Sequence, residues 1–194
     1  MTQTFIFALI LLVVVAVLAR AMLLSFRAQR PRDYAATAPE FDLKQVLNGP
    51  IQSEGLIYGP TGRMTNSFVA EMYGEWSGDS GTLTEVFTYS NGNTMQRKWF
   101  LELRSNNTFV AKADDIEGEG RGVISGSTVM LRYRIRLPED AGGHVLDTTD
   151  WMYLMADGTI MNRSEMRKFG IKVAELIATM RPAQVDENQT IAAQ

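Results

Sequence analysis

The chain has 194 residues, of which 45% are hydrophobic and 21% charged, and its formal net charge is −3. This composition is typical of a folded domain and excludes a disordered or strongly nucleic-acid-binding chain. The absence of cysteine and the presence of a single histidine exclude disulfides, thiol catalysis, zinc ribbons and multi-histidine metal centres. We therefore expect no cofactor, no metal site and no nucleic-acid partner.

The first 26 residues form an apolar segment. Residues 4–19 contain no charge, glycine or proline, and the apolar run resumes after Arg20 and ends at Phe26. A helix from Phe5 to Phe26 would be about 33 Å long at ~1.5 Å per residue, which matches a hydrocarbon core of roughly 30 Å. Residues 4–26 are therefore predicted to be a transmembrane anchor helix, with Arg20 extending to the interface.

Two alternatives to an anchor remain. The string Ala19-Arg20-Ala21 has the small-x-small pattern of a signal-peptide cleavage site. A signal peptide has a basic N-terminal region, however, and the three residues before Thr4 include no Lys or Arg. A buried core helix is disfavoured because so long an apolar run is rare in soluble domains.

The charges that flank this segment suggest an orientation. Its basic neighbours Arg20, Arg27, Arg30 and Arg32 all lie towards or beyond its C-terminal end. The positive-inside rule then predicts a single-pass protein of the inner (cytoplasmic) membrane with its body in the cytoplasm; a periplasmic body is the alternative. Residues 27–40, which contain two prolines, are predicted to be a linker.

The remainder of the chain is acidic. Its 15 basic and 22 acidic residues give it a formal charge of −7. Anionic lipid should repel such a body as a whole, so we expect contact with the bilayer to come from the stalk or from one local face.

The pattern from residue 41 onwards is typical of β-structure. All 16 glycines fall between Gly49 and Gly170, and turn signals recur every 8–12 residues or so. Apolar residues alternate between these turns, which predicts an all-β, antiparallel meander barrel of about eight to ten strands over residues 41–181. Residues 168–180 fit either a strand or a helix, and residues 182–194 are predicted to be a disordered tail.

One hairpin can be registered from the sequence. Keeping the apolar residues of both strands on one face places Leu83 opposite Trp99 and Glu85 opposite Arg97, with Gly92 in the left-handed position of a three-residue loop. A charged pair on an inward face costs desolvation energy. It is either a structural ion pair or a polar anchor for a ligand, since Arg97 is the natural partner of a carboxylate or phosphate.

Further candidates carry weaker signals. Asp114 and Asp115 begin an acidic cluster whose spacing does not match an EF-hand, so a solvated or arginine-paired turn is favoured over calcium. Arg132 lies on a charged strand face that is either an outer wall or a contact for lipid headgroups, and Tyr133 lies on the opposite, cavity-lining face. A polar and aromatic set either closes one barrel end or lines its mouth; it consists of Asp150, Trp151, Asn162 and Arg163.

Several strings also resemble a known family when they are taken in order. They are Leu83 to Gly92 with Gln96 to Trp99, Ala113 to Gly122, Leu131 to Pro138, Asp150 to Leu154, Asn162-Arg163 and Lys168 to Gly170. Together they are similar to the core of a bacterial family of unknown function that is regarded as lipocalin-like. The resemblance implies a lipocalin-like barrel, a strand over residues 168–180 and no established activity.

The same resemblance carries an association and a contrast. Relatives are often encoded beside cyclopropane-fatty-acid synthases, which implies a weak link to lipid modification. Many relatives look like exported lipoproteins with a cysteine after the signal, whereas this chain has no cysteine to carry a lipid.

Three functions follow as hypotheses. The first is a membrane-tethered binder of a fatty acyl or lipid-like molecule, with Arg97 and Glu85 orienting its head beside Trp99 and Tyr133. The second is an enzyme acting on lipid through Glu85, Asp114, Asp115 or Asp150, although no nucleophile-plus-base set is visible. The third is a non-catalytic accessory subunit whose partner is a lipid-modifying enzyme.

Overall fold

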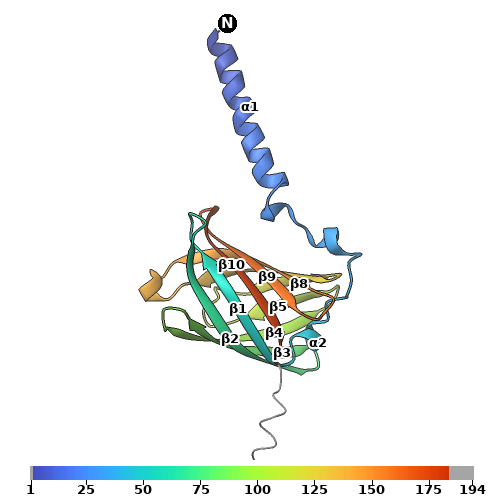
Figure 1. Cartoon of the computed structure of the whole chain (residues 1–194). Coiled ribbons are helices and arrows are strands. Elements are labelled where there is room, and N and C mark those ends of the chain that lie inside the picture. The colour runs from blue at the N-terminus through green and yellow to red at the C-terminus, as the bar shows by residue number, and fades with distance from the viewer. Residues whose placement is uncertain (1, 184–194) are drawn as a thin grey trace, which may run out of the picture.

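The structure is a computed structural model that describes residues 2–183. An N-terminal helix stands away from a closed β-barrel, as Figure 1 shows. This helix, α1 (Thr2–Leu23), contains an 18-residue window of mean hydropathy 2.4, none of which is buried. The helix is long and apolar enough to cross a membrane, and a signal sequence has the same properties.

Ten antiparallel strands follow one another around the barrel, and the first pairs with the last. They are β1 (Gly49–Tyr58), β2 (Met64–Ser77), β3 (Ser80–Tyr89), β4 (Thr94–Arg104), β5 (Thr108–Lys112), β6 (Gly120–Ser125), β7 (Thr128–Arg136), β8 (Val145–Leu154), β9 (Ile160–Lys168) and β10 (Ile171–Pro182). The predicted meander barrel is thereby confirmed, and closure leaves none of the ten strands at the edge of a sheet.

The predicted register of one hairpin is also confirmed. Leu83 pairs with Trp99 and Glu85 with Arg97 across β3 and β4, and Gly92 has a φ of +85° in the connecting loop. The sequence left residues 168–180 open between helix and strand. They end β9, turn at Phe169 and Gly170, and then form most of β10. Of the predicted tail, only the first two residues lie within the described part of the chain.

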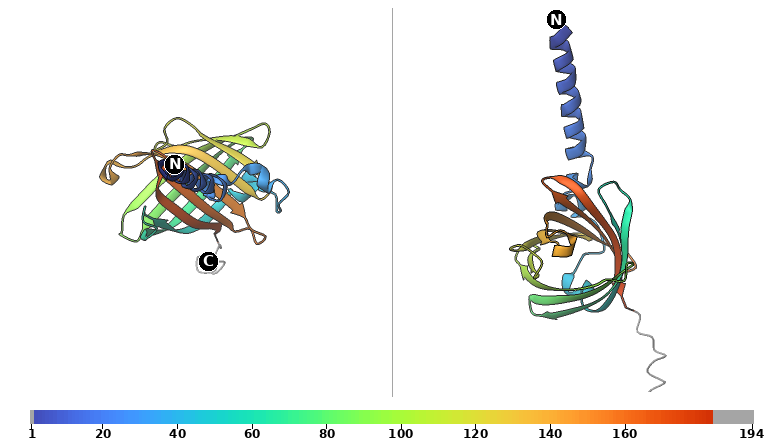
Figure 2. Two further views of the ribbon diagram at one scale, coloured as in Figure 1. Left: turned by 90° about the horizontal axis from the view of Figure 1, so that it is seen from above. Right: turned by 90° about the vertical axis from the view of Figure 1, so that its left-hand side faces the viewer.

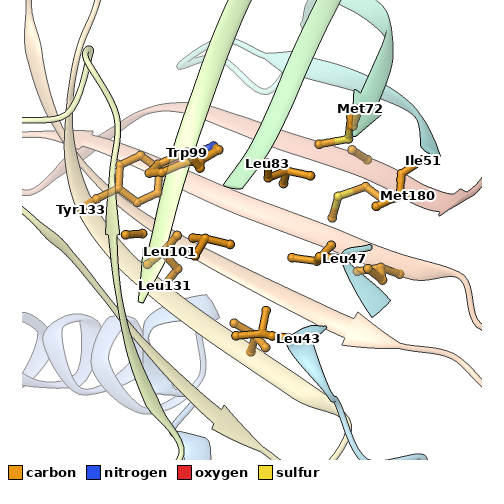
Figure 3. Packing of buried hydrophobic residues seen from close by; sticks show 14 of the residues in the cluster. Leu43, Leu47, Ile51, Met72, Leu83, Trp99, Leu101, Leu131, Tyr133 and Met180 are labelled. Carbon is orange, nitrogen blue, oxygen red and sulfur yellow. The ribbon is translucent and has the colours of Figure 1, made fainter. Parts of the chain in front are cut away.

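The floor of the barrel is closed by a short helix, α2 (Leu43–Val46), in the chain just before β1. Its side chain Leu43 and the neighbouring Phe41 and Leu47 are almost fully buried among the inward-facing residues of the strands. In Figure 3, Leu43 and Leu47 lie on one side of the labelled cluster, while Trp99 and Tyr133 lie together on the other. The indole nitrogen of Trp76 donates a 2.8 Å hydrogen bond to the Leu47 carbonyl, which fixes this plug to β2.

A close approach at Gly74 supplies a test of the plug. A Cβ at this position would overlap the backbone carbonyl of Leu47, which cannot move without displacing α2. We expect Gly74→Ala to destabilise the barrel by about 1–3 kcal/mol, the usual cost of overpacking, as measured by thermal unfolding of the full chain in detergent. The control Glu75→Ala alters the adjacent exposed position. Equal melting temperatures for the two variants would contradict this account of the plug.

The segment between α1 and the barrel lies against the outer wall. It contains two 3-10 turns, η1 (Phe26–Ala28) and η2 (Pro31–Tyr34). Phe26 is buried with Trp151, and the Tyr34 ring lies 5.3 Å from that of Trp151. Gln29 joins the segment to the wall, because its Oε1 accepts hydrogen bonds from the hydroxyls of Tyr34 and Tyr153. The predicted linker is therefore docked along strands β7 to β9.

Candidate functional site

The two ends of the barrel differ in how well they are covered. The floor carries α2, whereas the opposite end is formed by the connections β1–β2, β3–β4, β5–β6, β7–β8 and β9–β10. We call this second end the open end. Inward-facing apolar residues near it are only half-buried; they are Ile57, Tyr89, Met95, Met166 and Leu176. A molecule entering the barrel would therefore pass the open end.

An ion-pair group lies in the interior of the barrel between these two ends, and it consists of Arg97, Glu85 and Asp115. The Arg97 guanidinium donates hydrogen bonds to Asp115, which lies on the β5–β6 connection: Nη2 is 2.6 Å and Nε is 2.9 Å from Asp115 Oδ2. Glu85, the partner expected from the hairpin register, lies farther away, with 3.8 Å between Arg97 Nη1 and its Oε2. That oxygen also accepts a hydrogen bond of 3.2 Å from the indole of Trp99. Asp115 thus takes two N–H groups of Arg97, the residue that the sequence predicted either as a member of a structural ion pair or as a ligand anchor.

A second polar group faces this ion pair from β7, β8 and β9. The Tyr133 hydroxyl donates a 3.0 Å hydrogen bond to Asp150 Oδ2, and the Tyr133 ring packs edge-on against Trp99 at 5.3 Å. The other carboxylate oxygen of Asp150 and the hydroxyl of Thr148 are buried without a hydrogen-bond partner in the described residues. Buried polar atoms nearly always have a hydrogen-bond partner, so these two atoms are the unusual feature of the interior.

Burial also changes the acidity of the two carboxyl groups that face each other across this interior. It raises the pKa of Glu85 to about 7, although the Arg97 charge and the Trp99 hydrogen bond oppose that rise. Burial likewise raises the pKa of Asp150 to about 6, although the nearby hydroxyl groups of Ser164 and Tyr133 oppose that rise. Both groups therefore exchange protons close to neutral pH, where an exposed carboxyl group would be fully ionised.

The Glu85 shift predicts how stability depends on pH. Between its ordinary pKa of 4.5 and its folded pKa of about 7, the folded chain binds more protons than the unfolded chain. The free energy of unfolding therefore falls as the pH rises through this window, by about 3 kcal/mol from Glu85, and is level above it. We expect Glu85→Gln to remove most of this fall, as measured by melting temperatures from pH 5 to pH 8. An unchanged slope, matching that of the outer-wall control Glu54→Gln, would contradict the assignment.

The other residues predicted from the sequence lie in three places. Asn162 faces the interior, since it pairs with the inward residues Met152 and Ala178, and its Oδ1 accepts a hydrogen bond from Ser164. Asp114 is exposed beside Asp115, on the β5–β6 connection. The remaining three, Arg132, Trp151 and Arg163, belong to the outer wall where the η1–η2 segment docks.

The acidic cluster after β5 is divided among different cations. Asp115 points inwards to Arg97, whereas Glu117 pairs with Arg134 and Arg136 outside the barrel, and Glu119 with Lys112. The glycines of this connection serve different purposes: Gly118 has a φ of +74°, whereas a Cβ at Gly122 would overlap the Phe109 ring. This connection is therefore the arginine-paired turn that the spacing favoured.

Two small polar residues of the interior, Thr148 and Ser164, were not among the sites predicted from the sequence. They lie at inward positions of β8 and β9, and both are buried. The alternation of these strands could have placed them inside, but a hydroxyl there carries no charge to single it out. A pocket of about 470 Å³ lies on the outside of strands β2 to β5 and contains none of the interior polar groups.

Comparison with known proteins gives a family. The profile of a family described as "Protein of unknown function (DUF3833)" matches residues 20–182. The chain belongs to this family. The matched range of DUF3833 begins within α1 and ends with β10, so it includes the docked segment as well as the barrel. No curated protein matches the chain in sequence.

Solved structures show how widely the fold of this DUF3833 member is shared. Rv2717c from M. tuberculosis is similar with a TM-score of 0.54 at 16% identity, over 76% of this chain and 99% of its own. The S-type phycobiliprotein lyase CPES from Guillardia theta is similar with a TM-score of 0.56 at 6% identity, over 81% of this chain and 99% of its own. At such low identity the likeness shows a lipocalin-like fold alone.

Proposed function

We propose that the barrel binds one acyl lipid, with the chain among the half-buried apolar residues of the open end and the head at Asp150 and Thr148. The observation that carries this proposal is the pair of buried polar atoms without partners, Asp150 Oδ1 and Thr148 Oγ1. A hydroxyl or N–H group of a ligand would satisfy the carboxylate oxygen and could also bond to the threonine hydroxyl. Small closed barrels such as those of lipocalins hold one small ligand inside.

The charges around this site favour an uncharged head. The fork of Arg97 is taken by Asp115, and its remaining side faces Glu85. A fatty-acid carboxylate would therefore meet no free cation and would add a negative charge beside Glu85 and Asp150. A monoacylglycerol or a fatty alcohol offers the hydroxyl donor without that charge. We therefore propose an uncharged head at Asp150 and Thr148 in place of a ligand carboxylate at Arg97.

Native mass spectrometry of the full chain tests the proposal. We expect wild type released from detergent micelles to carry one neutral monoacyl lipid. Asp150→Asn places an amide donor where the carboxylate accepted, so we expect it to weaken lipid binding about tenfold or more. The control Asp147→Asn alters the exposed aspartate three residues earlier on β8 and should bind as wild type does. A wild-type chain without bound lipid, or equal binding by both variants, would overturn the proposal.

A second candidate is acid–base chemistry on the bound lipid. The observation that favours it is that the pKa values of Glu85 and Asp150 are raised to about 7 and about 6, close to the pH at which a general acid or base works best. The mass of the lipid before and after incubation separates the two functions. An unchanged lipid supports a binder, whereas a mass change that Asp150→Asn abolishes supports an enzyme.

We further propose that α1 is an uncleaved anchor in the inner membrane with the barrel on the cytoplasmic side. The support is that all four basic residues near the segment lie at its C-terminal end or beyond. The intact mass of the membrane-bound protein should include residues 1–21. A phosphatase fused after Gln194 should be inactive, and periplasmic activity of that fusion would overturn the orientation.

A further inference from the structure

The β9–β10 hairpin ends in apolar side chains that nothing in the described chain covers. Phe169 is 89% exposed and Ile171 is 69% exposed, on either side of Gly170. Phe169 also has a φ of +51°, a region that bulky residues seldom occupy because it costs energy. Folding of the barrel does not account for a large apolar ring held outwards in this way. A partner outside the barrel would.

The position of α1 indicates which partner this is. Only Leu24 and Ser25 separate the end of α1 from Phe26. Phe26 is fixed to the barrel, because it is buried against Trp151 and its ring lies 4.9 Å from the Arg163 guanidinium carbon. Three residue steps span at most about 11 Å. If α1 crosses a bilayer, the outer wall at β8 and β9 must therefore lie at the bilayer surface.

The hairpin tip is next to this attachment point. One groove of about 290 Å³ is lined by Phe26 and Arg27 on the anchor side and by Arg167 and Gly170 on the hairpin side. Figures 1 and 2 show the β9–β10 hairpin, together with the β1–β2 hairpin, extending towards the side of the barrel where α1 stands. The β1–β2 hairpin carries a further exposed apolar side chain, Met64, which is 58% exposed.

Basic residues surround the apolar tip. Lys168 places its ammonium 5.3 Å from the Phe169 ring centre. Lys172 and Arg167 follow on the two strands, where they form ion pairs with Glu175 and Glu165. Aromatic and aliphatic tips flanked by lysine and arginine suit the boundary between acyl chains and headgroups. The body as a whole has a charge of −7, whereas residues 165–175 contain three basic and two acidic side chains, so the hairpin is a weakly basic exception that an anionic bilayer would attract.

From these observations we infer that the tip of the β9–β10 hairpin, residues 168–172, inserts into the interface of the bilayer that holds α1. The inference rests on the membrane anchoring given under the proposed function, and it extends that function. The hairpin belongs to the open end of the barrel, so its insertion turns that end towards the bilayer. An acyl lipid then has a short path from the membrane to Asp150 and Thr148.

Site-specific labelling tests the inference, and the absence of native cysteine makes it simple. Phe169→Cys carries an environment-sensitive fluorophore in the full chain, reconstituted in vesicles of phosphatidylcholine and phosphatidylglycerol. The matched control is Met155→Cys, a 47% exposed residue of the β8–β9 loop at the floor end. We expect a blue-shifted probe at residue 169 that is quenched several-fold more by acyl-chain quenchers than by iodide. At residue 155 we expect the reverse.

The outcomes separate this inference from the proposed function. A chain that reconstitutes but shows equal iodide quenching at both positions overturns the hairpin insertion. That result would not contradict lipid binding in the barrel, which native mass spectrometry tests separately. A chain that does not stay with the vesicles overturns the anchor and the insertion together.

Discussion

Replacing Arg97 by methionine is expected to lower the free energy of unfolding by about 3–5 kcal/mol at pH 8, because it leaves carboxylates inside the barrel without their cation. The Arg97 side chain is 13% exposed, and its two partners Glu85 and Asp115 are 8% and 30% exposed. Unfolding of the full chain in detergent, followed by tryptophan fluorescence, measures the loss. At pH 5 we expect a smaller loss, because Glu85, with a pKa of about 7, is then protonated in the folded chain.

The control for this variant is Arg134→Met. Arg134 also contacts two carboxylates, Glu117 and Asp147, but its side chain is 59% exposed on the outer wall. Exposed ion pairs contribute about 0–1 kcal/mol, so the control should change stability little at either pH. Equal losses for the two variants would show that Arg97 is not the buried cation described.

Trp151→Ala should have an effect of similar size for a different reason. Trp151 is 1% exposed on the outside of the barrel, where Phe26, Met130 and Tyr34 cover it. Loss of a fully buried tryptophan usually costs about 3–5 kcal/mol. We also expect the docked segment to come loose, so that trypsin cuts after Arg27 or Arg32 faster than in wild type.

The control for the tryptophan is Phe100→Ala, at a 52% exposed aromatic position of β4. We expect a change well under the loss at Trp151 and no change in trypsin cleavage of the docked segment. Resistance of the Trp151 variant to trypsin, equal to that of wild type, would mean that the segment is held by contacts other than this aromatic cluster.

The β3–β4 hairpin shows what the sequence could predict about this molecule. Alternation fixed which residues share a face, and Gly92 fixed the loop, so the pairing of Glu85 with Arg97 followed without tertiary information. The pattern alone left residues 168–180 open between helix and strand. The family resemblance implied a strand, and the structure has β10 from Ile171 onwards.

The outer-wall positions of Trp151 and Arg163 could not be predicted from the sequence. They pair across β8 and β9 and share a face, but alternation alone does not say which face of a strand lies inside. Both faces of β8 carry large side chains, because the outer one is covered by Phe26 and Tyr34 from a segment more than a hundred residues earlier. A distant covering segment leaves no local signal on the strand that it covers.

The ion pair between Arg97 and Asp115 could not be predicted from the local sequence either. Asp115 lies 18 residues from Arg97, on a connection that bends back over the open end. Its placement depends on backbone contacts of that connection with β7, including a hydrogen bond from the Arg136 amide to the Asp115 carbonyl. The sequence indicated Asp115 as one of several acidic residues, and only the folded barrel selects it.

Photo-crosslinking tests most directly whether an acyl lipid lies inside the barrel. A monoacylglycerol with a photoreactive group in its acyl chain is bound to the full chain, irradiated, and mapped by peptide mass spectrometry. We expect saturable labelling of inward residues at the open end, among them Tyr89, Met95 and Met166. We expect Asp150→Asn to reduce this labelling of the inward residues. Labelling confined to α1 and the outer wall would contradict the claim.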